Sequence, residues 1–194
     1  MYEENINLRI INQAIIKDNI EFTNLGYQPI YSVNKNSKIL IIGQAPGLKA
    51  QQTNMTWNDK SGDKLRDWLG VTKEEFYNVD NFGLIPMDFY YPGKGKTGDL
   101  PPRKDFAPKW HPLILDNLVN VELIILIGNY SQHYYLNNKD TLTTNVKDFK
   151  KFLPTYLPLV HPSPLNFRWF INNPWFYDDV LPVLKEIVRN ILKK

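Results

Sequence analysis

The 194-residue sequence contains no cysteine. This absence excludes disulfides, thiolate zinc sites, cysteine nucleophiles and cysteine-ligated iron–sulfur clusters. Histidine is scarce as well, since only His111, His133 and His161 occur, and their spacing does not match a metal-binding pattern such as HExxH. We therefore expect a protein that needs neither a metal nor another cofactor.

Long apolar runs and a strong excess of one charge are also missing. No segment approaches the roughly 20 apolar residues of a membrane span, and the first ten residues are too acidic and polar for a secretory signal. We expect a cytoplasmic protein that acts as a monomer and has no membrane partner. The net charge is only +3, so a surface for nucleic acid must be a local patch.

Short apolar runs alternate with stretches of helical periodicity along the whole chain. This alternation predicts an α/β fold with one three-layer α/β/α domain over residues 1–194, built around a mainly parallel four-stranded sheet. Residues 1–37 are expected to form an N-terminal helix and a loop. Strands are predicted at 38–42, 81–86, 122–127 and 156–160, helices at 5–20, 61–69, 111–119, 129–138, 144–152 and 178–193, a short helix after the capping-box pattern at 72–75, and irregular loops at 44–60 and 91–109.

Two turns at predicted strand ends are the most informative segments. Gly43-Gln44-Ala45-Pro46-Gly47 follows the strand at 38–42, and His161-Pro162-Ser163-Pro164-Leu165-Asn166 follows the strand at 156–160. Open α/β sheets bind their ligands at the carboxyl ends of their strands. A shared site would require the fold to join two segments that lie over a hundred residues apart.

The first turn suits close contact with a polar ligand. Gly43 and Gly47 permit a tight backbone path, Pro46 stiffens it, and Gln44 offers both functions of its amide. The turn lacks a nucleophile and does not match the GxxxxGK[ST] pattern of a phosphate-binding loop. A plain strand-to-loop turn is the alternative interpretation.

The second turn places a histidine on a stiff loop, because Pro162 and Pro164 restrict the backbone after His161. A histidine held in this way can donate a hydrogen bond to charge that develops on a leaving group. The alternative is that His161 only satisfies a neighbouring backbone carbonyl.

In this order and at these strand ends, GQAPG and HPSPLN resemble the two signature motifs of the uracil-DNA glycosylase superfamily. The resemblance extends over roughly residues 38–190 and includes the run ELIILIG and the segment Tyr91-Pro92-Gly93. It implies a base-excision repair enzyme that flips a deaminated base out of DNA and hydrolyses its N-glycosidic bond, with uracil as the expected base.

The resemblance also implies roles for single residues. His161 would stabilise the anion of the departing base, and Leu165 would be the wedge that fills the gap in the duplex. Trp57 would stack on the base, unless it is only a core tryptophan. The first turn would line the substrate pocket with Gly43, Ala45, Pro46 and Gly47, and Ser163 and Asn166 would grip the DNA backbone.

Ala45 is a departure from the family pattern, because the best-known members carry Asp or Asn there to position water. Gln44 and Asp59 are the candidates to replace that group, and Asp59-Lys60-Ser61-Gly62 resembles the downstream D-x-S-G of one Ala-bearing branch. Asp59 is expected to polarise water or stabilise the sugar cation. Alternatively, it only caps the helix that begins near Ser61.

Two further departures concern base reading and the iron–sulfur cluster. The asparagine that reads uracil after the second strand is missing, and Asp88 can face a base N–H from that segment instead. Ala-bearing branches commonly hold an iron–sulfur cluster through four cysteines, so a chain without cysteine is expected to belong to a cluster-free branch.

Basic residues of the loop at 91–109 are candidates for contacts with the DNA backbone. Lys94 and Lys96 lie in its Gly-rich half, and Arg168 extends the same surface after the second turn. The alternative is a solvated loop. Competing functions for the whole chain are a non-catalytic binder of damaged DNA or a nucleotide, a hypoxanthine or xanthine glycosylase, and a glycosidase for free nucleosides.

Overall fold

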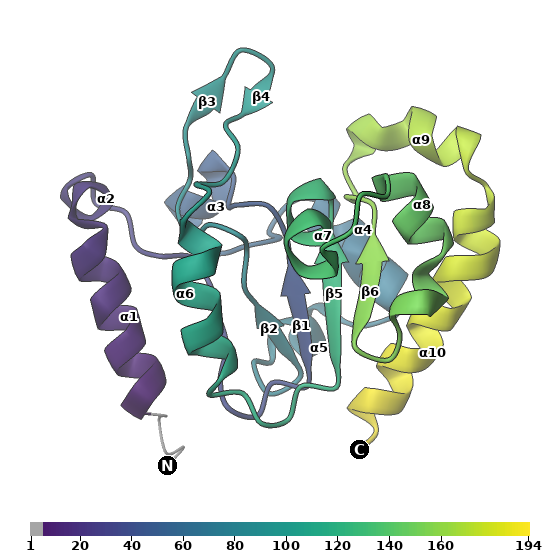
Figure 1. Cartoon of the computed structure of the whole chain (residues 1–194), viewed down its shortest axis with the longest axis horizontal. Helices are drawn as coiled ribbons and strands as arrows, with labels where there is room; N and C mark the ends of the chain where they lie inside the picture. Colours follow the sequence, from purple (N-terminus) through teal and green to yellow (C-terminus); the bar gives the residue numbers. More distant parts are fainter. Residues whose placement is uncertain (1–5) are drawn as a thin grey trace.

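The computed structural model describes residues 6–194. Its central sheet has the order β2 (Phe82–Leu84), β1 (Ile39–Ile42), β5 (Leu123–Ile127) and β6 (Tyr156–Leu159), and every neighbouring pair is parallel. The strands point towards the same end of the molecule (Figure 1). The four-stranded parallel sheet predicted from the sequence is therefore confirmed.

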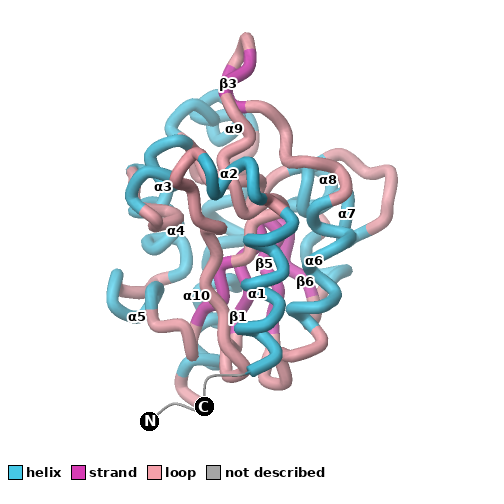
Figure 2. Tube along the Cα trace, turned by 90° about the vertical axis from the view of Figure 1, so that its left-hand side faces the viewer, coloured by secondary structure: helices cyan, strands magenta, loops and turns pink. Residues whose placement is uncertain are grey.

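Helices cover both faces of the sheet, which gives three layers (Figures 1 and 2). Successive side chains of a strand point to opposite faces. On β1, Ile39 and Ile41 pack in one apolar cluster with α4 (Lys60–Leu69) and α10 (Leu181–Leu192), whereas Leu40 packs in another with α1 (Ile6–Asp18) and α6 (Phe106–Leu115). The helices are α1 (Ile6–Asp18), α2 (Ile20–Asn24), α3 (Leu48–Thr53), α4 (Lys60–Leu69), α5 (Lys73–Tyr77), α6 (Phe106–Leu115), α7 (Asn129–Leu136), α8 (Leu142–Lys147), α9 (Phe167–Asn172) and α10 (Leu181–Leu192).

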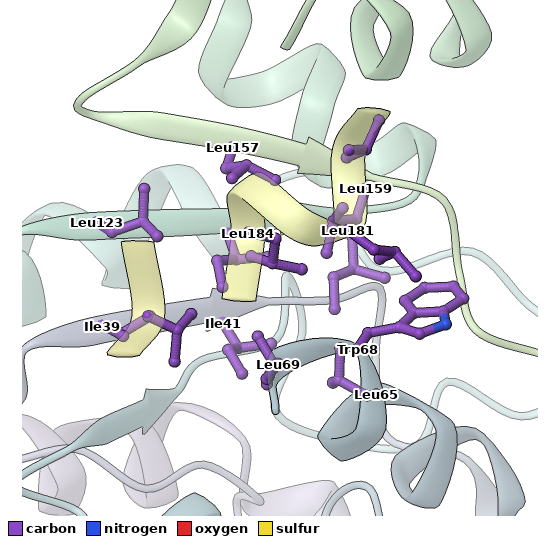
Figure 3. Packing of buried hydrophobic residues seen from close by; sticks show 14 of the residues in the cluster. Ile39, Ile41, Leu65, Trp68, Leu69, Leu123, Leu157, Leu159, Leu181 and Leu184 are labelled. Atoms are coloured by element: carbon purple, nitrogen blue, oxygen red, sulfur yellow. The ribbon is translucent and has the colours of Figure 1, made fainter. Parts of the chain in front are cut away.

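The largest apolar cluster lies between the sheet, α4 and α10 (Figure 3). Leu65, Trp68 and Leu69 form the buried face of α4, as their spacing predicts, and Gly70 ends this helix in the left-handed conformation with φ 71°. The capping box at Thr72 is also present, since both of its reciprocal hydrogen bonds form at the start of α5. Local sequence signals thus define this layer.

The prediction of an irregular loop at 91–109 was wrong in two respects. A small antiparallel hairpin forms from β3 (Lys94–Gly95) and β4 (Gly98–Asp99), because Gly93 and Gly98 adopt positive φ angles that other residues avoid. The following helix, α6, begins at Phe106 rather than at 111 and contains Pro112.

Other boundaries differ from the prediction by less. The connection at 44–60 contains α3, and the predicted helix at 144–152 divides into α8 and a 3-10 turn at Phe149–Phe152. A π-helical segment at Phe176–Val180 leads into α10. The first helix was predicted from residue 5, which lies outside the described part of the chain.

An ion pair between the partly exposed Arg103 and the buried Asp88 anchors the base of the hairpin segment. Asp88 is 0% exposed, and its carboxylate accepts hydrogen bonds from the Arg103 side chain at 2.7 Å and 2.8 Å and from the backbone N–H groups of Tyr90 and Arg103. Since these contacts join the two ends of residues 88–103, they hold the intervening hairpin in place.

Arg103 also ties this segment to the N-terminal helices. Its guanidinium donates to the side chain of Asn19 at 2.6 Å and lies over the rings of Phe22, Tyr90 and Phe106 at 4.7, 5.6 and 4.7 Å. Cation–π contacts of this kind strengthen when they are removed from water. The arginine therefore joins α2, with its N-cap residue Asn19, and α6 to the loop that carries the hairpin.

His111 is a second buried polar group, only 1% exposed on α6. The Pro86 carbonyl can only accept, so Nε2 of His111 carries the proton that it donates at 3.0 Å, and Nδ1 accepts from the Tyr135 hydroxyl at 2.6 Å. Burial lowers the pKa of His111 to about 4. The ring is therefore neutral at physiological pH.

The free energy of unfolding is expected to fall as the pH falls from about 6.5 to 4. In this window the unfolded chain binds a proton at His111 that the folded chain rejects, so up to about 3 kcal/mol is lost. Urea unfolding at several pH values measures it, with the exposed His133→Gln variant as the control. The His111→Gln variant should show a shallower pH dependence, and an unchanged slope would contradict the assignment.

Candidate active site

A cavity of about 660 Å³ lies where β1 and β6 end, and both turns line it. The fold thus joins the two segments that the sequence separates by over a hundred residues. Predicted site residues on its wall are Gly43, Gln44, Ala45, Pro46, Gly47, Trp57, Asp59, His161, Ser163, Leu165 and Asn166.

The backbone of the first turn is held by the segment that follows β2. The Met87 N–H donates to the Gly43 carbonyl at 2.9 Å, and the Asp88 N–H donates to the Gln44 carbonyl at 3.2 Å. A Cβ on Gly43 would lie 3.2 Å from the Trp57 ring, so a glycine lets the indole approach the turn closely. The first turn is therefore a rigid part of the cavity wall.

Trp57 is held in an uncommon backbone conformation. Its φ of 57° is left-handed, which costs a non-glycine residue about 1–2 kcal/mol. Two contacts hold it there: Arg66 donates to the Trp57 carbonyl at 3.2 Å, and the Tyr77 hydroxyl donates to the Thr56 carbonyl at 2.8 Å. A Cβ on Gly62 would lie 1.7 Å from the Trp57 carbonyl oxygen, so only glycine fits at the start of α4.

The Trp57 indole packs against the imidazole of His161. Their ring centroids are 5.4 Å apart and the planes differ by 28°. Trp57 is half-buried, contacts the main apolar cluster and also lines the cavity. The Trp57 side chain is thus part of the apolar packing and also reaches the cavity, where a ligand could contact it.

Hydrogen bonds within the second turn set the tautomer of His161. The Ser163 N–H donates to Nδ1 at 3.1 Å, so Nδ1 is unprotonated and the neutral ring carries its proton on Nε2. Burial lowers the pKa of His161, although the negative charge of Asp59 opposes the shift. The Asn166 side chain donates to the His161 carbonyl at 2.8 Å and stiffens the loop. His161 is therefore a neutral donor through Nε2.

Asp59 has two positions at once, because it caps α4 and lines the cavity. Its carboxylate accepts from the Gly62 N–H at 2.9 Å, the usual bond of a helix N-cap. Its charge also reaches the His161 ring across the cavity. The structure thus shows the helix cap, and the place of Asp59 on the cavity wall leaves its catalytic role a prediction.

Asp88 does not lie on the cavity wall. Its carboxylate is enclosed by the contacts with Arg103, and Pro86 lines the cavity from the same segment instead. The carbonyl of Pro86 already accepts from His111. This segment therefore offers a base little polar contact.

The remaining predicted residues lie on the outer surface at the same end of the sheet. Leu165 is 88% exposed at the cavity mouth, Arg168 is exposed on α9, and Lys94 and Lys96 are exposed on the hairpin. The hairpin and α9 stand above the carboxyl ends of the strands (Figure 1). These side chains are thus exposed at the end of the sheet where the cavity lies, and Leu165 also lines the cavity.

Other lining residues escaped the sequence analysis. The most notable belong to the hairpin segment, where Thr97, Asp99 and Leu100 reach the cavity. The signal that points to them is the length of the Gly- and Lys-rich stretch, since long loops in compact domains commonly serve function. The further lining residues Lys49, Met55, Thr56, Asn58 and Ser61 belong to the connection between the first turn and α4.

Comparison with models of known protein families shows to which family this chain belongs. The family model described as the uracil DNA glycosylase superfamily matches residues 30–185. The chain belongs to the uracil DNA glycosylase superfamily. Both turns and the strands of the sheet lie within the matched range.

A comparison with solved structures finds a likeness to an NMR structure of a candidate uracil DNA glycosylase from Methanosarcina acetivorans. The two chains share 15% sequence identity, the match covers 79% of this chain and 94% of the other, and the TM-score is 0.46. Within residues 6–194, no helix has the length and apolar character to span a membrane, and no three acidic or histidine side chains gather as a metal site would require.

Proposed function

We propose that this protein is a DNA glycosylase that extrudes a deaminated base and hydrolyses its N-glycosidic bond. Uracil is the base that we expect it to prefer. The observation that carries the proposal is the cavity in which a neutral His161 meets the first signature turn, in a chain of the uracil DNA glycosylase superfamily. The reaction needs no cofactor, because the leaving group is a base whose anion can be stabilised by hydrogen bonds.

His161 is proposed to stabilise the departing base. When the bond between C1′ of the sugar and the base nitrogen breaks, the electron pair leaves with the base, and negative charge reaches its carbonyl oxygen. The Nε2–H of His161 is the free donor of the ring and meets that oxygen. A preorganised donor stabilises developing charge without reorganisation during the reaction.

The surroundings of the cavity suit extrusion of a nucleotide. Leu165 is an exposed apolar side chain on a loop stiffened by hydrogen bonds, as a wedge between base pairs requires. Trp57 offers an aromatic surface to the extruded base. The exposed Arg168, Lys94 and Lys96 are proposed to contact DNA phosphates, and such contacts weaken with salt.

Base preference is the second part of the proposal. Because Asp88 is enclosed and Pro86 takes its place on the wall, polar reading of the base falls to Gln44 and Asn58. Each amide has a donor and an acceptor, which suits uracil and also hypoxanthine. A panel of oligonucleotides with uracil, hypoxanthine or xanthine, single- and double-stranded, ranks the bases by the rate of release.

A non-catalytic binder is the alternative that Ala45 favours, since the first turn lacks a polar group for water. Tight binding to damaged DNA without release of any base in the panel would support this alternative and reject the glycosylase. Release from a free nucleoside but not from an oligonucleotide would indicate a nucleosidase.

Asp59→Asn is expected to lower turnover by about 10²-fold or more while DNA affinity stays near that of the wild type. Asparagine caps a helix nearly as well as aspartate, so the variant keeps α4 intact and removes only the charge beside His161. Single-turnover release of uracil and a thermal unfolding curve test both parts. Full activity of this variant would reduce Asp59 to a helix cap.

A further inference from the structure

The carboxylate of Asp99 lies over the first turn, although 51 residues separate it from Gly47 in the sequence. A Cβ built on Gly47 would be 3.6 Å from Oδ2 of Asp99, and Asp99 lines the same cavity as His161. The Gln44 amide donates to the Leu100 carbonyl at 3.4 Å, which links the hairpin to the turn. The hairpin thus delivers an acidic group to the signature motif.

Asp99 makes few contacts that would stabilise the fold. Among residues 6–194, none of the ion pairs involves it, and its polar contact is the Tyr91 hydroxyl, which donates to Oδ1 at 3.4 Å. Asp59, in contrast, is engaged as the cap of α4. A carboxylate without a cationic partner, on the wall of a cavity proposed to take a nucleotide from DNA, repels phosphates. We therefore expect it to have a role in the reaction.

The first turn has no acidic side chain that could orient a water molecule. Ala45 carries no polar atom, and Gln44 is directed towards Leu100. Apart from Gln44, the turn itself therefore offers a water molecule only backbone groups. Asp99 is a carboxylate that approaches the turn from outside it.

We propose that Asp99 is a catalytic carboxylate that orients the attacking water and accepts its proton, while the charge of Asp59 stabilises the sugar cation. This inference rests on the proposed glycosylase function and adds a second acid to it. It assigns the hairpin to catalysis in addition to DNA contact.

The step balances with water as the co-reactant. The bond between C1′ and the base nitrogen breaks, and its electron pair leaves with the base, stabilised by His161. The water oxygen then forms a bond to the cationic C1′, and one water proton passes to the carboxylate of Asp99. That proton returns to solvent, the base anion takes up a proton from solvent, and the products are the free base and an abasic sugar.

Single-turnover release of uracil from an oligonucleotide tests the inference. Asp99→Asn is expected to slow release by about 10²-fold or more, with DNA affinity equal to or slightly tighter than that of the wild type because a negative charge is removed. Asp99→Glu should recover part of the rate, since it restores a carboxylate. Asp105→Asn is the matched control, because Asp105 is exposed near the hairpin but does not line the cavity.

Wild-type release rates in Asp99→Asn would overturn the inference while the glycosylase function stands. A loss of affinity as large as the loss of rate would also overturn it, since the hairpin would then only bind DNA. If the wild type and Asp105→Asn release no base, the proposed function itself fails. Matching thermal unfolding midpoints for Asp99→Asn and the wild type exclude misfolding as the cause of a slow rate.

Discussion

His161→Ala should lower the single-turnover rate of base release by about 10²–10³-fold. This is the usual effect of removing one preorganised donor from developing negative charge. The structure makes the loss specific to the leaving group, because Nδ1 is occupied by the Ser163 N–H and only Nε2 is left to donate. Rapid-quench assays on an oligonucleotide containing uracil measure the rate directly.

His133→Ala is the control for this variant, since His133 is exposed on α7 and does not line the cavity. It should release base at the rate of the wild type. An undiminished rate in His161→Ala would remove the central residue of the proposed mechanism.

Arg103→Met is expected to lower the free energy of unfolding by about 3–5 kcal/mol. The reason is that Asp88 stays fully buried after its charge partner has been removed. The variant also loses the guanidinium that lies over three aromatic rings. Urea unfolding followed by tryptophan fluorescence gives the difference from the wild type.

Two further variants serve as comparisons for Arg103→Met. Arg103→Lys should restore less than the full stability, because an ammonium cannot match the forked contact with both carboxylate oxygens. Lys104→Met, at the exposed neighbouring position, should stay within about 0.5 kcal/mol of the wild type. An equally small effect for Arg103→Met would show that the ion pair does not anchor the hairpin segment.

The fold could be predicted where local signals are strong. Short, continuous apolar runs such as residues 122–127 gave the strands of a buried parallel sheet, and the capping box at Thr72 and the glycine at position 70 marked helix boundaries. The hairpin at 94–99 was missed because glycines such as Gly93 and Gly98 permit irregular loops as well as tight turns. Contacts outside the hairpin also hold it in place. Arg103 and Asp88 close its base, and neither carries a local sign of the other.

The candidate site also has features that could be predicted from the sequence and features that could not. The two turns could be predicted because each is a short motif at a strand end, and the parallel sheet brings such ends together. The enclosure of Asp88 and the approach of Asp99 to Gly47 could not be predicted, since both follow from how residues 88–103 fold back. The place of Trp57 after the first turn indicates a site residue, but its backbone conformation depends on Arg66 and Gly62, which lie further along the chain.

The two turns are proposed to form one site for hydrolysis of an N-glycosidic bond in DNA. The most direct measurement is mass-spectrometric detection of free uracil after incubation of the purified protein with uracil-containing single- and double-stranded oligonucleotides. We predict free uracil and an abasic site with the wild-type protein, and strongly reduced amounts with His161→Ala. Intact oligonucleotide after prolonged incubation with excess wild-type protein, together with no release of hypoxanthine or xanthine from matched substrates, would contradict the account.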